Sequence, residues 1–232
     1  GGSARKRHPL HERRALMAPR IVLIDYHKGN LLSVARSLSD VGAEITITDE
    51  PDKIRAAAGL VLPGVGSFED AMGFLHESGV AEALADALAR KVPFLGICLG
   101  EHLIMEYGDE SAGGYCAGMG MVRGSVRKLD GSTLKVPHVG WNQLELTESG
   151  RRCPLFAGVE DGAHVYFTHS HALDDDVDEG IVAAYTSYTR RFASAIWDGS
   201  ALFAVQFHPE KSSTVGLRIL KNFVSLVPGG RP

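Results

Sequence analysis

The segment FLGICLGEHLIMEYG, Phe94–Gly108, places Cys98 between two glycines at the end of an apolar run. The pattern G-I-C-L-G (Gly96–Gly100) is typical of a nucleophile elbow, in which a strand ends, the chain turns sharply and a helix begins. Flanking glycines let such a turn form without a side-chain clash, and a helix start favours a thiolate. The segment therefore predicts an exposed nucleophile at the carboxyl end of a strand, the alternative being a buried structural cysteine.

A second segment, VQFHPEKS (Val205–Ser212), supplies the base that a nucleophilic cysteine needs. An apolar strand is followed by His208 and, two positions further on, by Glu210. If Pro209 keeps the backbone extended, the two side chains point to the same side. His208 would then hold the thiol proton while Glu210 orients and charges the imidazole. Together the two segments predict a Cys98–His208–Glu210 triad, whereas an isolated histidine would more often be structural.

The third segment, LPGVGSF (Leu62–Phe68), is a glycine-rich turn after another apolar stretch. Backbone N–H groups in such a turn can form an oxyanion hole, and Gly64 and Gly66 would let the turn move when substrate binds. Taken alone the pattern is weak, because most such turns only reverse the chain.

Strands and helices alternate around these segments. The apolar periodicity predicts strands at Arg20–Asp25, Glu44–Asp49, Gly59–Gly64 and Pro93–Cys98, and helices at Leu31–Gly42, around Lys53–Ala58 and from Phe68 to Arg90. Near-continuous apolar strands that alternate with helices indicate a largely parallel sheet with helices on both faces. The expected fold class is α/β.

The second half of the chain has shorter apolar segments. These predict strands near Gly120–Lys128, Val165–His169, Ile181–Tyr188, Ala193–Trp197 and Ala201–Gln206, several of them antiparallel, and a final helix at Val215–Val227. The sheet is therefore expected to be mixed but mostly parallel.

The composition is ordinary for a soluble enzyme. Of 232 residues, 44% are hydrophobic and 22% charged, and the formal net charge of −4 offers no basic field for nucleic acid. Three widely spaced cysteines without a CxxC pair suggest neither a disulfide framework nor a zinc ribbon. We expect one domain in a reducing cytoplasm, with no nucleic-acid or membrane partner.

Residues 1–19 are basic and aperiodic, and are expected to be a disordered extension or a tag remnant, with Met17 a candidate natural start. They lack the apolar segment of a signal peptide, and no apolar run approaches the roughly 20 residues that cross a bilayer. The folded domain is expected over 20–227, with a tail at 228–232.

In this order the segments resemble the class I (triad) glutamine amidotransferases. A narrower resemblance, to the glutaminase subunits of imidazole glycerol phosphate synthases, covers nearly the whole chain. It rests on IDYHKGNLLSV, LPGVGSFEDAM, FLGICLG, LKVPHVGWNQL, YFTHSH, QFHPEKS and VGLRILKNF, which together span Ile24 to Phe223. The Gly-x-Cys-x-Gly and His-Pro-Glu elements occur in many amidotransferases, whereas PHVGWNQ and the Glu-Lys-Ser after the histidine favour the narrower family.

The resemblance implies a flavodoxin-like amidotransferase fold and a glutaminase that needs no cofactor or metal. Cys98 would attack the glutamine carboxamide, His208 would shuttle the proton, and hydrolysis of the glutamyl thioester would give glutamate and ammonia. In the family, ammonia passes to a (β/α)8 synthase subunit, with which the glutaminase forms a heterodimer, and reacts there with a ribonucleotide in histidine biosynthesis.

The resemblance also assigns binding positions. The oxyanion and substrate-binding residues would be Gly64, Val65, Gly66, Leu99, Gly100, His102, Thr168, His169 and Ser170. The segment Pro137–Trp141, including His138, and Lys211 would lie toward the synthase subunit. Without the resemblance, Trp141 and His138 would be read as packing residues and Lys211 as an exposed lysine.

The sequence departs from the family at three places. Glu101-His102 replaces the usual Met-Gln, His27-Lys28 precedes Gly29-Asn30 where Gly-Met is usual, and YFTHSH replaces Tyr-Phe-Val-His-Ser-Tyr. His102 cannot present the combined donor and acceptor of a carboxamide, which would weaken glutamine binding. Glu101 either faces the site, where it would disfavour the thiolate, or points to solvent.

These departures leave alternatives open. The chain could be a normal glutaminase with tolerated substitutions, a paralogue with another amide substrate or ammonia acceptor, or a catalytically idle partner of a barrel subunit. A metal hydrolase that uses His102, His169 and His171 is a more distant alternative.

Overall fold

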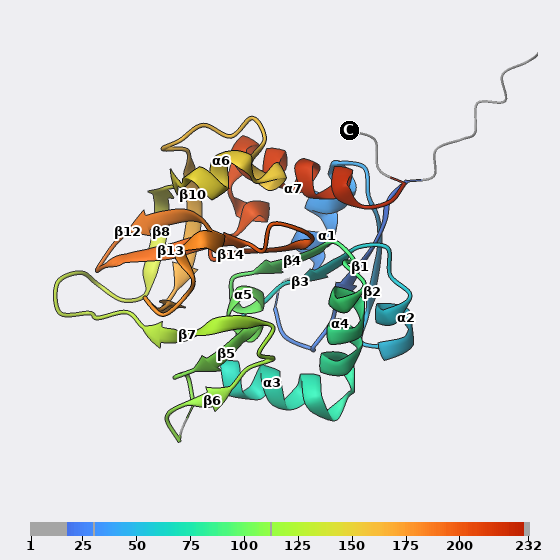
Figure 1. Ribbon diagram of the computed structural model, residues 1–232, viewed down its shortest axis with the longest axis horizontal. Coiled ribbons are helices and arrows are strands. Elements are labelled where there is room, and N and C mark those ends of the chain that lie inside the picture. The colour runs from blue at the N-terminus through green and yellow to red at the C-terminus, as the bar shows by residue number, and fades with distance from the viewer. Residues whose placement is uncertain (1–17, 30, 112, 230–232) are drawn as a thin grey trace, which may run out of the picture.

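A computed structural model describes residues 18–29, 31–111 and 113–229. Its central sheet has the strand order β2-β1-β3-β4-β14-β13-β12-β9 (Figure 1). The neighbours from β2 to β14 are parallel and those from β14 to β9 are antiparallel, so the prediction of a mixed, mostly parallel sheet is confirmed. The strands are β1 (Arg20–Ile24), β2 (Glu44–Thr48), β3 (Leu60–Leu62), β4 (Phe94–Ile97), β9 (Glu145–Leu146), β12 (Val182–Ser187), β13 (Arg191–Trp197) and β14 (Leu202–Val205).

Helices cover both faces of this sheet. Helices α1 (Leu31–Asp40) and α7 (Ser213–Leu226) pack on one face, against side chains such as Leu23 of β1. Helices α2 (Pro51–Arg55), α3 (Phe68–Glu77), α4 (Val80–Ala89) and α5 (Leu99–Leu103) pack on the other, where Ile24 of β1 points. Alternate residues of a strand thus enter two separate cores, which explains the continuous apolar runs.

The remaining strands form two smaller sheets beside the carboxyl ends of the parallel strands. One has the order β11-β7-β5-β6, and the other pairs β10 with β8. Their bounds are β5 (Met105–Gly108), β6 (Cys116–Ala117), β7 (Val122–Lys128), β8 (His138–Gln143), β10 (His164–His169) and β11 (His171–Leu173). The chain also forms α6 (Glu148–Arg152) and the 3-10 turns η1 (Pro154–Phe156), η2 (Glu179–Ile181) and η3 (Pro209–Lys211).

The prediction of one helix from Phe68 to Arg90 is wrong. The helix ends at Glu77 and a new one begins at Val80, because Gly79 adopts a left-handed conformation with φ of 75°. The Ser78 hydroxyl donates to the Phe74 carbonyl at 2.7 Å and closes the first helix. The apolar periodicity continues across the break, so the periodicity alone does not reveal it.

The expected extension and tail lie mostly outside the described residues, which begin at Ala18 and end at Gly229. Within the described ranges, no helix is long and apolar enough to span a membrane.

Candidate active site

Cys98 occupies a strained turn between β4 and α5. Its φ of 52° and ψ of −107° lie outside the conformations that a non-glycine residue normally adopts. The Cys98 N–H donates to the Val205 carbonyl of β14 at 2.7 Å, which ties the turn to the neighbouring strand. This is the elbow conformation expected from the sequence, and it lies at the carboxyl end of the parallel sheet.

The glycines around Cys98 serve close packing rather than the turn itself. The backbone of Cys98 has a positive φ angle, whereas the φ angles of Gly96 and Gly100 lie outside the left-handed region. A Cβ on Gly100 would lie 1.9 Å from the Leu62 carbonyl oxygen of β3, and one on Gly96 would lie 2.8 Å from the Gly100 carbonyl oxygen. The glycines therefore let α5 approach the sheet closely enough to place Cys98.

His208 and Glu210, the base and orienter predicted from the sequence, lie in contact with each other. His208 Nδ1 lies 2.8 Å from Glu210 Oε1, and the two side chains are only 4% and 5% exposed. Burial lowers the pKa of His208, but the Cys98 thiol and the Glu210 carboxylate together outweigh it and raise that pKa to about 10. His208 Nε2 has no hydrogen-bond partner among the described residues, so this nitrogen is free to exchange a proton with the neighbouring thiol.

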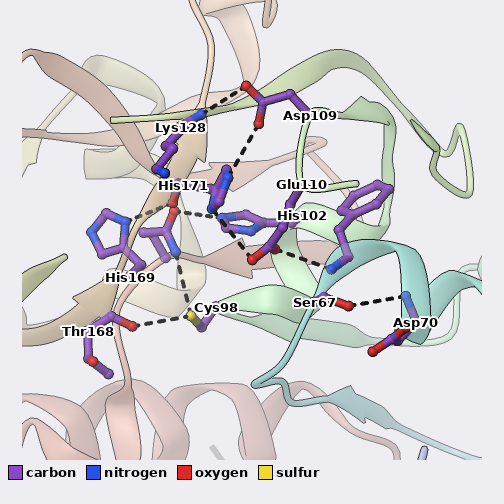
Figure 2. A network of polar contacts seen from close by, with 12 residues as sticks. Ser67, Asp70, Cys98, His102, Asp109, Glu110, Lys128, Thr168, His169 and His171 are labelled. Atoms are coloured by element: carbon purple, nitrogen blue, oxygen red, sulfur yellow. Dashed lines mark hydrogen bonds and ion pairs between the residues drawn. The ribbon is translucent and has the colours of Figure 1, made fainter. Parts of the chain in front are cut away.

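Cys98 also contacts two groups that approach from different strands. Its Sγ lies 4.0 Å from the Thr168 carbonyl oxygen of β10 (Figure 2). The Gln206 Nε2 donates to the same sulfur over 3.7 Å. Gln206 follows β14, is fully buried and was missed by the sequence analysis. Its signal in the sequence is a polar residue at the end of an apolar segment, two positions before His208.

His102, in the short helix α5, contacts Gln206. Its Nε2 lies 2.8 Å from Gln206 Oε1, and burial lowers the pKa of His102 to about 4, although the contact with Gln206 opposes this. His102 is therefore neutral near pH 7. Because Nε2 faces an amide oxygen it carries the proton, which leaves Nδ1 as an acceptor.

A cavity of about 290 Å³ opens over the Cys98 sulfur. Its lining includes most of the predicted substrate-binding residues but not Gly64 or Gly100, and it includes Pro137, which the resemblance assigned to the partner interface. The lining residues are Val65, Gly66, Cys98, Leu99, His102, Glu110, Pro137, Thr168, His169, Ser170 and His171. Glu110 and His171 were missed as lining residues because they reach the cavity only through the packing of β11 and of the segment that follows β5.

The predicted oxyanion turn makes a contact that the sequence did not reveal. The Val65 N–H donates to Tyr26 Oη at 2.9 Å, and the Tyr26 hydroxyl faces the Val65 carbonyl at 3.3 Å. Burial raises the pKa of Tyr26, so the hydroxyl stays protonated. In this conformation the Val65 N–H is occupied, and the turn must shift before that group can reach an oxyanion.

His169 belongs to a directed chain of hydrogen bonds. His169 Nδ1 contacts the His171 carbonyl at 2.8 Å, and its Nε2 contacts His138 Nδ1 at 2.9 Å. Asn142 Nδ2 lies 3.3 Å from His138 Nε2. Because a carbonyl only accepts, each imidazole must donate toward His171 and accept on its other nitrogen. Burial lowers the pKa of His138 to about 4 and that of His169 well below its usual value, so both rings are neutral.

The residues assigned to a partner surface divide into two groups. His138 is only 3% exposed and stacks on Phe167 and Tyr188, so its side chain does not reach the surface as expected. Trp141 is 52% exposed, and Lys211 is also exposed.

The three histidines of the metal alternative do not converge. His171 lies between two carboxylates, with Nε2 3.5 Å from Asp109 Oδ1 and Nδ1 3.7 Å from Glu110 Oε1 (Figure 2). His102 and His169 use their Nε2 atoms for Gln206 and His138. Within the described ranges, no group of three or more His, Cys, Asp or Glu side chains is arranged to hold a metal ion.

Glu101 neither lines the cavity nor points to solvent. Its side chain is fully buried, and neither carboxyl oxygen has a hydrogen-bond partner among the described residues. Burial, and to a smaller extent the nearby Cys98, raise the pKa of Glu101 well above its ordinary value of 4.5. The group is therefore protonated near neutral pH and remains unsatisfied.

Replacing Glu101 with methionine should stabilise the fold by about 1–3 kcal/mol, because the variant removes an unsatisfied buried polar group. Above the unfolded-state pKa, folding of the wild type must take up a proton at Glu101, so its stability falls as pH rises and the gain from Glu101→Met should be larger at pH 8 than at pH 5. Urea unfolding at both pH values measures this. Glu77→Met, at an exposed position of α3, is the control; equal stabilities of wild type and Glu101→Met would contradict the expectation.

A sequence model of the family "Glutamine amidotransferase class-I" matches residues 22–226. The chain belongs to this family. It is therefore a cysteine-dependent amidotransferase that hydrolyses glutamine, and the elbow at Cys98 lies inside the matched region.

Individual amidotransferases share much of the sequence. The imidazole glycerol phosphate synthase subunit HisH of Chloroflexus aurantiacus is 46% identical over 204 residues, covering 88% of this chain and 94% of that protein. The subunit HisH of Moorella thermoacetica is 45% identical over 207 residues, covering 89% and 95%. The narrower resemblance found in the sequence is thus supported along nearly the full length of these relatives.

Solved structures show the same amidotransferase fold at low identity. PurLQS from Thermotoga maritima superposes with a TM-score of 0.72 at 17% identity, covering 90% of this chain and 99% of that chain. The glutaminase domain of Trypanosoma brucei CTPS gives 0.69 at 15% identity, covering 90% and 93%. The predicted fold class is confirmed.

Proposed function

We propose that the chain is the glutaminase subunit of an imidazole glycerol phosphate synthase and hydrolyses glutamine through Cys98. The observation that carries the proposal is the strained elbow at Cys98 beside a buried imidazole that contacts Glu210 at 2.8 Å. Relatives of 45–46% identity that bear the HisH name support the assignment to histidine biosynthesis.

The chemistry follows from the charges at the site. His208 holds the thiol proton, and the raised pKa of His208 favours a thiolate and imidazolium pair. The Cys98 sulfur attacks the side-chain carbonyl carbon of glutamine, and the imidazolium gives its proton to the departing nitrogen, which leaves as ammonia. His208 then accepts a proton from water, whose oxygen attacks the thioester; glutamate leaves and the thiol is restored.

The tetrahedral intermediates need hydrogen-bond donors for their oxyanion. Leu99 and Gly100 begin α5, and the first N–H groups of a helix have no acceptor within it. The Val65 N–H would join them once the turn leaves Tyr26. Release of the Gly64–Gly66 turn from Tyr26 on substrate binding would therefore complete the oxyanion hole and give full activity.

The charged groups of the cavity fit the amino-acid end of glutamine. Glu110 supplies a carboxylate that can bind the substrate ammonium, and its Oε2 already accepts from the Phe68 N–H at 3.2 Å, which fixes its position. The same carboxylate faces His171. The substrate ammonium would have to displace His171 from Glu110 or share the carboxylate with it.

A partner surface is proposed next to the triad. Trp141 and Val139 are 52% and 56% exposed on β8, and the Trp141 ring meets the Tyr166 ring edge-on at 6.0 Å. Lys211 Nζ lies 5.9 Å from the Tyr166 ring and directly follows Glu210. An exposed aromatic and basic patch of this kind suits protein docking, and the proposed partner is a (β/α)8 synthase subunit in a heterodimer.

Glutamate release tests the proposed function. The chain should be assayed with glutamine alone, with its cognate barrel subunit, and with barrel subunit and ribonucleotide substrate, each with and without a chelator. We expect turnover that the ribonucleotide stimulates and the chelator leaves unchanged. No turnover in a complex shown to form would contradict the proposal and favour a different amide or ammonia acceptor; loss of activity with chelator would favour a metal enzyme.

His102→Gln should lower the KM for glutamine at least about fivefold. The reason is that a carboxamide at this position restores a donor and an acceptor to the cavity, where a lost hydrogen bond costs about 1–3 kcal/mol. Steady-state kinetics of the complex measure the effect. His76→Gln, at a histidine that is 56% exposed on α3, is the matched control. An unchanged or higher KM would show that His102 is not an impaired substitute for glutamine.

A further inference from the structure

We propose that the Gln206 carboxamide stabilises the Cys98 thiolate by donating a hydrogen bond to the sulfur, and that His102 is the positioning residue that keeps this carboxamide turned toward the sulfur. The inference rests on the proposed function, because it concerns the same nucleophile. It gives His102 a role that does not require contact with substrate.

Gln206 is held firmly between the two groups. Its backbone N–H donates to the Ser194 carbonyl of β13 at 3.0 Å, and the side chain is fully buried. The two ends of its carboxamide reach Cys98 Sγ at 3.7 Å and His102 Nε2 at 2.8 Å. Both polar ends of this buried amide are therefore occupied.

The orientation of the amide follows from what each neighbour can do. A thiolate accepts hydrogen bonds and cannot donate, so it favours the NH₂ end of Gln206. The oxygen end then faces His102, whose Nε2 must carry a proton. A neutral imidazole can place its one proton on Nε2, and this tautomer completes a continuous bridge from His102 through Gln206 to Cys98.

The bridge offsets a less favourable contact at the sulfur. The Thr168 carbonyl oxygen, 4.0 Å from Sγ, can accept from the thiol but repels a thiolate. The Gln206 NH₂ group supplies a donor in the same buried surroundings, where a hydrogen bond to an ionised group is stronger than one between neutral groups. The amide therefore favours the ionised form of the nucleophile.

Other titratable side chains interact electrostatically with the same sulfur, so a test of the bridge must leave these side chains unchanged. Cys98 raises the pKa of His208, and its charge also raises the pKa values of Glu101 and Tyr26. The titratable side chains that surround the sulfur and its bridge are Tyr26, Glu101, His102, Glu110, His169, His171, His208 and Glu210. The substitutions at Gln206 below leave all of them in place.

The test is the pH profile of Cys98 alkylation by iodoacetamide, measured on the full chain by mass spectrometry of the Cys98 peptide. Gln206→Glu keeps the size of the side chain but replaces the donor, and should move the half-maximal rate to higher pH by about one unit, the equivalent of one hydrogen bond. Gln206→Met removes the donor without adding charge and should move it by about half a unit or more. Gln143→Glu makes the same chemical change at an exposed position of β8 and should leave the profile unchanged.

His102 variants separate positioning from simple packing. His102→Leu frees the amide to rotate and should shift the profile in the same direction as Gln206→Met. His102→Gln can still donate to Gln206 and should restore the wild-type profile. Circular dichroism and thermal unfolding confirm that each variant is folded.

Unchanged profiles in both folded Gln206 variants would overturn the bridge, and glutamine hydrolysis by Cys98 would stand. A shift in the Gln206 variants with equal profiles for His102→Leu and His102→Gln would overturn the positioning role of His102. If wild-type Cys98 did not react at all, the nucleophile of the proposed function would fail together with the bridge.

Discussion

Replacing Cys98 with alanine should lower the kcat for glutamine hydrolysis at least about 10⁴-fold, because a thioester needs a thiol and, among the described residues, neither Cys116 nor Cys153 lines the cavity. Cys98 is the elbow residue under the cavity and neighbours the imidazole of His208. Alanine removes only the sulfur, so the fold should persist. Glutamate release by the complex with its barrel subunit measures the loss.

Cys116→Ala is the matched control, because Cys116 is a free cysteine of β6 that does not line the cavity. Its activity should equal that of the wild type. Glutamine hydrolysis by Cys98→Ala at the wild-type rate would show that the nucleophile has been assigned to the wrong residue.

Gly100→Ala should destabilise the fold by about 3 kcal/mol or more and should also abolish activity, since overpacking against an immovable group is costly. The added Cβ would lie 1.9 Å from the Leu62 carbonyl oxygen. That oxygen belongs to the backbone of β3, so α5 and the sheet would have to separate. Their separation would move Cys98 away from His208. Urea unfolding and glutamate release measure the two effects.

Gly73→Ala provides the opposite case. Gly73 lies in α3, and a Cβ there would meet nothing within 4 Å. This variant should gain about 0.5–1 kcal/mol, the usual advantage of alanine over glycine in a helix. A Gly100→Ala protein as stable as Gly73→Ala would refute the packing explanation for the elbow glycines.

Local patterns predicted the elbow and the contact of His208 with Glu210. Both depend on neighbours in sequence: Gly96–Gly100 forms one turn, and His208 and Glu210 lie two positions apart. The parallel strands were predicted for the same reason, because each is a short apolar run bounded by turn residues.

Contacts between distant segments could not be predicted in this way. Tyr26 reaches Val65, and Gln206 joins Cys98 to His102, only because β1, β3, β4 and β14 are neighbours in the sheet. Glu110 enters the cavity through the packing of the second sheet. From the sequence, Glu101 was expected either to face the site or to point to solvent. In the structure its side chain is fully buried and does not line the cavity.

The most direct test of the account is covalent labelling with 6-diazo-5-oxo-norleucine, a glutamine analogue whose diazoketone alkylates an active-site thiol with loss of nitrogen gas. The chain should be treated in complex with its barrel subunit and digested for mass spectrometry. We expect a label on the Cys98 peptide that excess glutamine prevents and that Cys98→Ala lacks. A label on another residue, or labelling of Cys98 that glutamine does not prevent, would contradict the claim that Cys98 is the nucleophile of a glutamine site.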